Sequence, residues 1–272
     1  SGDDSLKFLQ SQFTNDISLL ESGIIDHQLS GYCNPKGRLV ALIRVLRLKE
    51  SSYLLIMPHN IIKKVFNRLK LFILRAKVNL AVATNNSNIV GVYCEDFDFE
   101  VNKMLSFNDF YLLRDIDCQV FGPRAWLIGD NNLIKTTVKE INVSKKSQII
   151  EVDNFTWKTS ELSAGNLWID ESNSETFIPQ SVNLDLNSAV SFTKGCYPGQ
   201  EVVARTHYLG KVKRRLILVS VKQSKLKNIE IKKECPVFQK NLKNNFLTEV
   251  GQVVDISNHV TPSNEKKTLM LV

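Results

Sequence analysis

Residues 192–215 read FTKGCYPGQEVVARTHYLGKVKRR and contain one cysteine, Cys196, that stands apart from the others. It follows Lys194 by two residues and directly precedes a predicted helix start. A nearby cation and a helix N-terminus both favour the thiolate form of a cysteine. None of the other four cysteines has such neighbours in the sequence. Cys196 is therefore predicted to serve reactivity or contact, and the competing interpretation is a small apolar residue at a helix entry.

The neighbours of Cys196 each allow a structural and a functional interpretation. Glycine is predicted to be required at positions 195 and 199 by the backbone, either for a positive φ or for a close approach of another group. Tyr197 is interpreted equally as a stacking surface for a flat heterocycle or as a packing residue. Lys194 either favours the thiolate and contacts an anion, or is solvated.

Charged residues near this loop are candidate ligand contacts. Glu201 falls in the first turn of the predicted helix. There it either complements the helix dipole, which contributes roughly 0.3–1 kcal/mol, or contacts the cysteine loop or a bound ring. Arginine forks suit carboxylates. The basic candidates for a bound anion or a partner are Arg205, Lys36, Arg38, Lys213, Arg214 and Arg215, and solvation is the favoured interpretation for Lys213.

Composition and length indicate a globular protein of two or three small domains. The chain has 272 residues, of which 43% are hydrophobic and 23% charged, and no apolar run reaches the length of a membrane span. Five scattered cysteines argue against a disulfide framework and suit a reducing compartment. No CxxC, no Cys/His pair at ligand spacing and no histidine triad occurs, so no metal site is predicted.

The positive charge of the chain lies at its C-terminal end. Residues 205–272 hold 14 Lys/Arg against 5 Asp/Glu, whereas the overall net charge is only +7. Such an excess indicates a surface that meets an anion, RNA or a partner. The alternative is a solvated, lysine-rich face.

The pattern of apolar and turn residues predicts an α+β body followed by an all-β domain. Helices are expected over residues 6–13, 60–76, 131–140 and 156–162, with Gly165 as a C-cap. A hairpin is expected around the turn at residues 34–37, and strands over residues 53–57, 89–94, 111–114, 125–128, 216–221, 237–239 and 250–254. The predicted domains are residues 1–205, the α+β body, and residues 206–272, a small C-terminal β-barrel.

The chain resembles the YgfZ family of folate-binding proteins, which are relatives of the glycine-cleavage aminomethyltransferase. Residues 194–201, KGCYPGQE, match the family signature K-G-C-Y-x-G-Q-E at every fixed position. Further matches lie at residues 8–16, 33–38, 177–184, 202–205 and 213–216. In the second of these segments Asn34 replaces the commoner Asp.

The resemblance implies a fold, a cofactor and a role. The expected fold is an aminomethyltransferase-like ring of three modules, two α/β modules and the small barrel, with tetrahydrofolate or a derivative at the centre. Cys196 would be the functional thiol, and Lys194, Tyr197, Glu201 and Arg205 would lie beside the folate, together with Lys36 and Arg38. The expected role is assembly or repair of iron–sulfur clusters, and through them support of radical enzymes that modify tRNA. The expected partners are iron–sulfur assembly or client proteins, with a tRNA contact as a further expectation and no membrane. A bacterial cytoplasmic location is expected, with the mitochondrion as the alternative.

One departure from the aminomethyltransferase bears on activity. Ala41 and Leu42 occupy the place where that enzyme carries an Asp pair, and neither side chain can hold a proton beside a folate nitrogen. Folate binding without turnover is therefore expected. Two alternatives remain open at this point: an active folate-dependent aminomethyltransferase or one-carbon transferase, and a module that binds tRNA directly.

Overall fold

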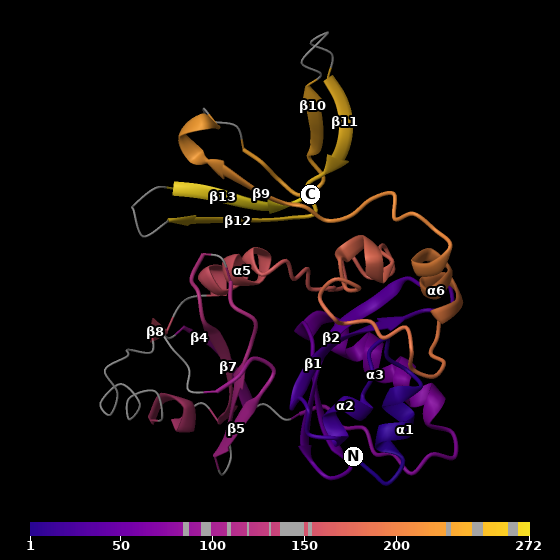
Figure 1. The fold of residues 1–272 in the computed structure, drawn as a ribbon. Coiled ribbons are helices and arrows are strands. Elements are labelled where there is room, and N and C mark those ends of the chain that lie inside the picture. The colour runs from indigo at the N-terminus through magenta and orange to yellow at the C-terminus, as the bar shows by residue number, and fades with distance from the viewer. Residues whose placement is uncertain are drawn as a thin grey trace.

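The computed structural model describes residues 1–83, 87–93, 99–107, 110–118, 120–130, 132–136, 150–151, 154–226, 230–240, 247–260 and 266–272 (Figure 1). Cys94 and half of the helix predicted over residues 131–140 lie outside these ranges. Residues 132–136 are helical. No helix in the described ranges is long and apolar enough to cross a membrane.

The first part of the chain forms a three-stranded antiparallel sheet. Its order is β1 (His27–Cys33), β2 (Leu39–Lys49) and β3 (Ser52–Ile56). The predicted hairpin is confirmed: Asn34 Oδ1 accepts the backbone N–H groups of Lys36 and Arg38, and Gly37 has a φ of 70°. Such an Asx turn, with glycine in the left-handed region, reverses the chain without strain.

Three helices accompany this sheet: α1 (Ser5–Gln10), α2 (Ser18–Glu21) and α3 (His59–Ile73). In α3 the residues Ile61, Val65 and Leu69 are buried, at the four-residue spacing that places side chains on one helix face. They pack in one apolar cluster with residues of α1 and β2. The hydrophobic face of α3 thus covers the sheet.

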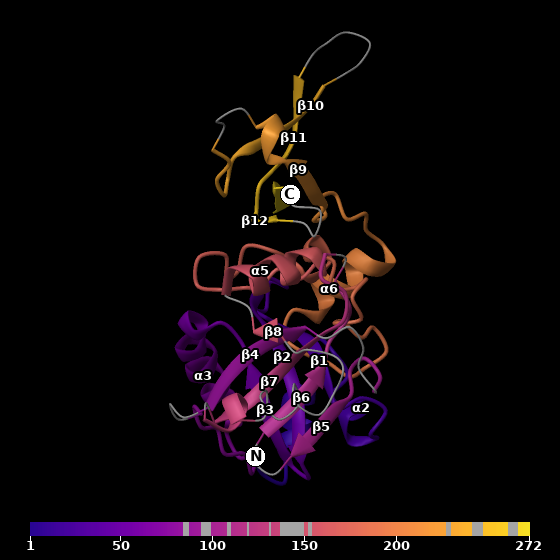
Figure 2. The same ribbon diagram turned by 90° about the vertical axis from the view of Figure 1, so that its left-hand side faces the viewer.

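The second sheet has five antiparallel strands in the order β5-β6-β7-β4-β8. The strands are β4 (Ser87–Tyr93), β5 (Met104–Phe107), β6 (Phe110–Arg114), β7 (Arg124–Asp130) and β8 (Ile150–Glu151). Helix α5 (Asn154–Ser163) follows, and Gly165, with a φ of 77°, ends it as predicted. Figures 1 and 2 show α5 between this sheet and the C-terminal strands.

The chain then returns to the first sheet. The backbone N–H of Leu39 donates to the Phe177 carbonyl, and that of Glu175 donates to the Leu39 carbonyl. This segment contains a short 3₁₀ helix, η1 (Pro179–Val182), and α6 (Gln200–Tyr208). The helix predicted to start after Cys196 is therefore present. Residues far apart in sequence build one core here, which includes Leu42 of β2 and Val203 of α6.

The C-terminal strands form two separate sheets. These are β12-β13-β9 and the ribbon β10-β11, built from β9 (Leu218–Lys222), β10 (Pro236–Lys240), β11 (Leu247–Gln252), β12 (Asp255–Val260) and β13 (Lys266–Leu271), with the 3₁₀ turn η2 (Gln223–Lys225). The pairing of the described strands does not close a barrel, so the predicted C-terminal barrel is not confirmed. The domain boundary at residue 205 stays a prediction.

Several local expectations differ from the structure. Of the strand predicted over residues 250–254, residues 250–252 end β11, and residues 253–254 lie between β11 and β12. The elements α2, β5, β8, β12 and β13 were not predicted. The first two are only four residues long and too short for periodicity to identify.

Candidate functional site

Lys194 is buried, and its ammonium group is fully engaged by backbone carbonyls. Its Nζ donates to the carbonyl oxygens of Gln10, Phe13 and Asn15 at 2.7, 2.6 and 2.8 Å. An ammonium has three donors, so all of them are used. Burial lowers the pKa of Lys194 to about 8. The solvated interpretation is therefore wrong, and the lysine ties the cysteine loop to the end of α1.

The two glycines of the loop differ. Gly199 has a φ of 80°, and a Cβ there would lie 2.4 Å from the Asn34 carbonyl oxygen and 2.6 Å from the Cα of Gly37. The predicted backbone requirement is thus confirmed for Gly199. Gly195 does not fit it: its φ is not positive, and a Cβ there would meet no described atom within 4 Å. The backbone at Gly195 borders open space.

Cys196 is exposed, whereas Cys33 and Cys118 are buried. Burial raises the pKa of Cys33 to about 12, which makes that thiol inert at neutral pH. Cys235 is partly exposed. Of the described cysteines, Cys196 offers its thiol most openly to an external partner.

Tyr197 is buried beneath the loop, with the Lys194 ammonium 5.4 Å from its ring centroid. Burial raises its pKa above the ordinary tyrosine value. Its ring packs within the protein, in agreement with the interpretation of Tyr197 as a packing residue.

Most of the remaining charged candidates are exposed, whereas Arg215 is half-buried. Glu201 and Arg205, whose side chains are 88% and 73% exposed, approach each other only to 3.9 Å. Lys36 lies on the surface, and Arg38 donates to the Thr176 carbonyl at 2.6 Å. Arg215 forms two hydrogen bonds with the Asp185 carboxylate, at 2.8 and 2.7 Å. The guanidinium group of Arg215 is therefore already paired with a carboxylate of the protein itself.

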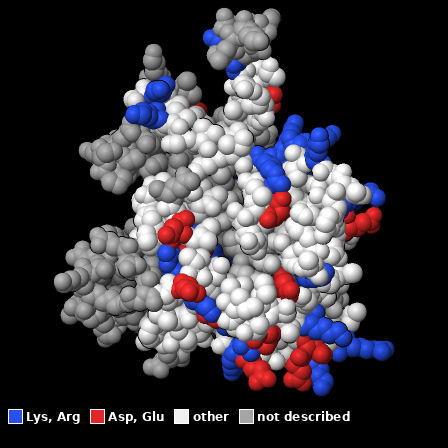
Figure 3. Space-filling view, in the orientation of Figure 1, with Lys and Arg blue, Asp and Glu red and all other residues white. Residues whose placement is uncertain are grey.

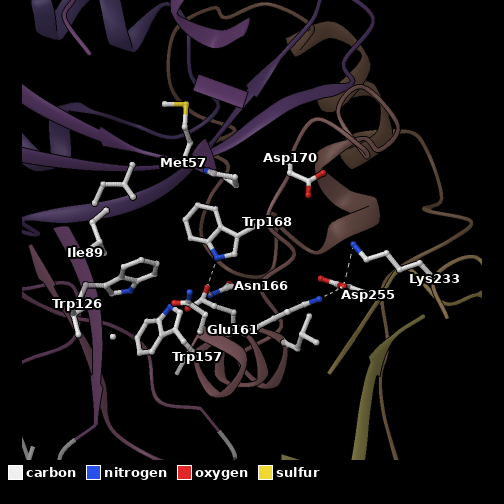
Figure 4. Close-up of a pocket in the computed structure, with 17 residues that line it drawn as sticks. Met57, Ile89, Trp126, Trp157, Glu161, Asn166, Trp168, Asp170, Lys233 and Asp255 are labelled. Carbon is white, nitrogen blue, oxygen red and sulfur yellow. Dashed lines mark hydrogen bonds and ion pairs between the residues drawn. The ribbon is translucent and has the colours of Figure 1, made fainter. Parts of the chain in front are cut away.

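A second region, which sequence reasoning missed, is a cavity of about 560 Å³ between the first sheet, the second sheet, α5 and the C-terminal strands. All three tryptophans of the chain line it: Trp126 of β7, Trp157 of α5 and Trp168. The ring centroids of Trp126 and Trp157 are 5.0 Å apart, and those of Trp126 and Trp168 are 6.0 Å apart. Figure 4 shows the indoles on one side of the cavity and Asp170, Lys233 and Asp255 on the other.

Two buried polar atoms on the cavity wall have no partner among the described residues. They are the Nε1 donor of Trp157 and the Oδ1 acceptor of Asn166. A buried polar group without a partner is costly, which points to a bound molecule or ordered water that completes it. Flat aromatic faces beside a free donor and a free acceptor suit a flat heterocycle with polar edges.

A buried ionic network holds the tryptophan wall in place. Glu161 accepts the indole N–H of Trp168 at 2.6 Å and pairs with Arg124. Asp115 accepts the indole N–H of Trp126 at 2.9 Å and pairs with Arg124 and with Arg44 of β2. The network therefore joins the two sheets and α5.

Two charged groups of this network, Asp115 and Arg124, have shifted pKa values. Burial opposes ionisation of Asp115, but the two arginines outweigh it and hold its pKa below the ordinary range. Burial also opposes the charge of Arg124, yet Glu161 and Asp115 raise its pKa. Asp115 and Arg124 are thus charged at neutral pH. The carboxylates of Asp115 and Glu161 orient two of the three indoles.

The cavity rim carries cations. Lys158 of α5 and Lys233 both contact Asp255, at 2.7 and 3.3 Å. Burial opposes ionisation of Asp170, but hydrogen bonds from Ser172 outweigh it and lower the pKa of this carboxyl. The rim therefore carries two ammonium groups, which share Asp255, and a second carboxylate, Asp170.

The predicted site residues do not line this cavity. The pocket comes from segments that are distant in sequence, and no local spacing indicated their meeting. The one available signal in the sequence was the presence of three tryptophans, because aromatic side chains often line ligand sites. Ala41 and Leu42 are fully buried in the apolar cores, as their character predicts. No group of three metal-ligating side chains occurs in the described ranges.

Comparison with known proteins gives consistent matches. A protein named tRNA-modifying protein YgfZ from Photorhabdus laumondii is 31% identical over 234 residues, which cover 83% of this chain and 68% of that protein. Its namesake from Blochmanniella pennsylvanica is 27% identical over 264 residues, 93% of this chain and 77% of that one. No protein-family model matches the chain.

A solved structure supports the fold. The crystal structure of glycine cleavage system aminomethyltransferase T from Bartonella henselae aligns with 100% of this chain and 74% of its own, with a TM-score of 0.66 and 13% identity. The chain thus has an aminomethyltransferase-like fold of mixed helices and sheets.

Proposed function

Because the chain belongs to the YgfZ family, we propose that it is a folate-binding protein that supports iron–sulfur cluster assembly or repair, and through it the radical enzymes that modify tRNA. The observation that carries this proposal is the cavity lined by all three tryptophans. The proposed ligand is tetrahydrofolate or a derivative.

The chemistry of the cavity fits a folate. A pterin is flat and has donors and acceptors along its edges, which complement the indole faces and the unpartnered atoms of Trp157 and Asn166. The glutamyl tail of folate is anionic and would compete with Asp255 for Lys158 and Lys233 at the rim. Bound tetrahydrofolate would supply the chemistry of one-carbon transfer.

The proposal includes folate binding without turnover, because the described residues offer no free carboxylate suited to act as an acid or base at the folate. Ala41 and Leu42 are buried and offer no acid or base. In the cavity, Glu161 and Asp255 are ion-paired, and the lowered pKa of Asp170 makes it a weak base. An assay with an aminomethyl-loaded carrier protein tests the transferase alternative directly, and clear turnover contradicts this part.

Tryptophan fluorescence offers a direct test of binding, because every indole of the chain borders the cavity. Anaerobic titration with tetrahydrofolate should quench the fluorescence saturably. Trp157→Phe keeps an aromatic ring but removes the unpartnered N–H, so it should weaken binding roughly tenfold. Tyr208→Ala, outside the cavity, should leave binding unchanged. Absence of saturable quenching contradicts folate binding.

The cellular role has a separate test in a gene deletion. The deletion should lower the activity of [4Fe–4S] enzymes, including those that modify tRNA, and Cys196→Ser should fail to restore it because the exposed thiol is removed. Normal activities in the deletion strain under oxidative stress contradict the role. Full rescue by Cys196→Ser limits that residue to packing.

A further inference from the structure

The C-terminal end of α6 and the segment that follows it form a basic and aromatic surface outside the cavity. We propose that this surface binds a single-stranded stretch of RNA. It consists of Arg205, His207, Tyr208, Lys211, Lys213 and Arg214 and is called the α6 surface below. The surface itself is independent of the folate pocket, whereas the choice of RNA over DNA rests on the proposed function.

Beyond Glu201, which approaches Arg205 to 3.9 Å, the charge of this surface is of one sign. Residues 202–229 contain eight Lys/Arg and no Asp/Glu. Lys211, Lys213 and Arg214 are exposed, and none forms an ion pair with a residue that the structure describes. Figure 3 shows Lys and Arg side chains gathered where the chain leaves α6. Unpaired cations on an exposed segment suit a phosphate backbone, whose binding releases counterions.

An aromatic group lies among these cations. The rings of Phe192 and His207 stack at a centroid distance of 3.6 Å and an interplanar angle of 14°. Tyr208 packs edge-on against His207 at 4.8 Å and is 64% exposed. Its ring is held in a defined orientation yet open to solvent, and unstacked bases bind such rings.

The pairing of aromatic rings with cations favours RNA over an acidic protein segment. Acidic side chains would pair with the cations but would not stack on the exposed rings. Each nucleotide presents both a phosphate for the cations and a flat base for the rings. The stack of Phe192 on His207 also fixes the start of the cysteine loop to the end of α6. Cys196 therefore lies on a loop attached at both ends to the helix that carries the α6 surface.

Fluorescence anisotropy with the full chain tests the proposal. The probes are a labelled uridine RNA and the matching thymidine DNA, each of about 12 nucleotides, and an unmodified tRNA transcript. Tyr208→Ala should weaken RNA binding at least about fivefold, because one base can no longer stack. Lys213→Gln combined with Arg214→Gln should reduce the slope of log affinity against log salt by about 0.7 for each phosphate that is no longer neutralised.

A matched control lies on α3, which also carries exposed cations and an aromatic ring. The variant Lys63→Gln, Lys70→Gln, Phe72→Ala should bind RNA as the unaltered protein does. Circular dichroism melting curves establish that each variant is folded. Tetrahydrofolate titration of the same variants should be unchanged, so a failure of the RNA proposal is separable from a failure of folate binding.

Four outcomes overturn the proposal. Three of them are no RNA binding at about 50 mM salt, an equal weakening of binding in the α3 control, and tighter binding of the DNA than of either RNA. Binding of an acidic peptide through the same residues, without RNA binding, assigns the surface to a protein partner and also overturns it.

Discussion

Gly37 and Gly199 lie backbone against backbone, so that a Cβ on Gly199 would lie only 2.6 Å from the Cα of Gly37. The early hairpin turn and the cysteine loop therefore touch without any side chain between them. Both residues have a positive φ, of 70° and 80°. The contact sets the position at which α6 begins.

Substitution of Gly199 should be costly. Gly199→Ala combines a left-handed backbone with a clash against the Asn34 carbonyl and is expected to lower the free energy of unfolding by about 2 kcal/mol or more. Gly195→Ala, in the same loop but with open space around it, should change it by less than about 0.5 kcal/mol. Denaturant unfolding measures both. Equal stability of the two variants contradicts the contact.

Lys194→Met should destabilise the protein without any ligand present. The variant removes the donor from three carbonyls, two of which form fully buried bonds, and the free energy of unfolding is expected to fall by about 3 kcal/mol. Lys36→Met, on the surface, serves as the control and should be nearly neutral. If Lys194→Met keeps full stability but loses ligand affinity, the lysine belongs to a binding site instead.

The ionic network behind the cavity gives a third prediction. Glu161→Gln removes one of the two carboxylates that pair with the buried Arg124. Breaking such a buried pair is expected to lower the free energy of unfolding by about 3–5 kcal/mol. Near-ultraviolet circular dichroism should also change, because Trp168 donates to Glu161. Glu171→Gln, at an exposed site, is the matched control. A near-neutral Glu161→Gln would show that the network does not support the tryptophan wall.

His27 predicts how stability depends on pH. Burial and the neighbouring Arg44 lower its pKa to about 3, from an ordinary value of 6.5. Between these two values the unfolded chain takes up a proton that the folded protein does not, so stability falls as pH falls from 6.5 toward 3. The slope from this group is at most about 1.4 kcal/mol per pH unit.

The variant His27→Gln isolates this effect. Its stability should fall less steeply over the same pH range, whereas His59→Gln, an exposed control, should follow the unaltered protein. Chemical unfolding at a series of pH values measures the difference. Parallel curves for all three proteins argue against a neutral buried His27.

Alkylation should distinguish the cysteines. In the folded protein Cys196 should react with iodoacetamide well before Cys33 and Cys118, because only Cys196 of these three is exposed. Peptide mass spectrometry at increasing times measures the order. The same reaction in denaturant removes the difference and is the control. Early modification of Cys33 would contradict its burial.

Sequence reasoning predicted the parts of the fold that local patterns specify. The hairpin at residues 34–37 was predicted because Asn and Gly determine the turn type, and α3 because its apolar spacing extends over 15 residues. The elements α2, β5, β8, β12 and β13 were missed. Short elements depend on tertiary contacts more than on their own periodicity.

The site was predicted only in part. The signature around Cys196 indicated a loop before a helix, and this is present. It also indicated a thiol kept for reactivity or contact, which stays a prediction for this exposed cysteine. It did not indicate that Lys194 is buried on three carbonyls, since those carbonyls belong to residues 10–15. The tryptophan cavity had no signature at all, because its walls come from four separate parts of the chain.

The sequence by itself determined the family, the cysteine loop and the basic C-terminal segment, because each is a property of neighbouring residues. Only the tertiary structure decided that Gly37 supports Gly199, that Asp115 and Glu161 orient the indoles, and that the predicted folate contacts lie away from the cavity. The physical reason is that burial and ion pairing arise between residues far apart in the chain. A local pattern can indicate that a side chain is suited to a contact, but folding determines which partner it meets.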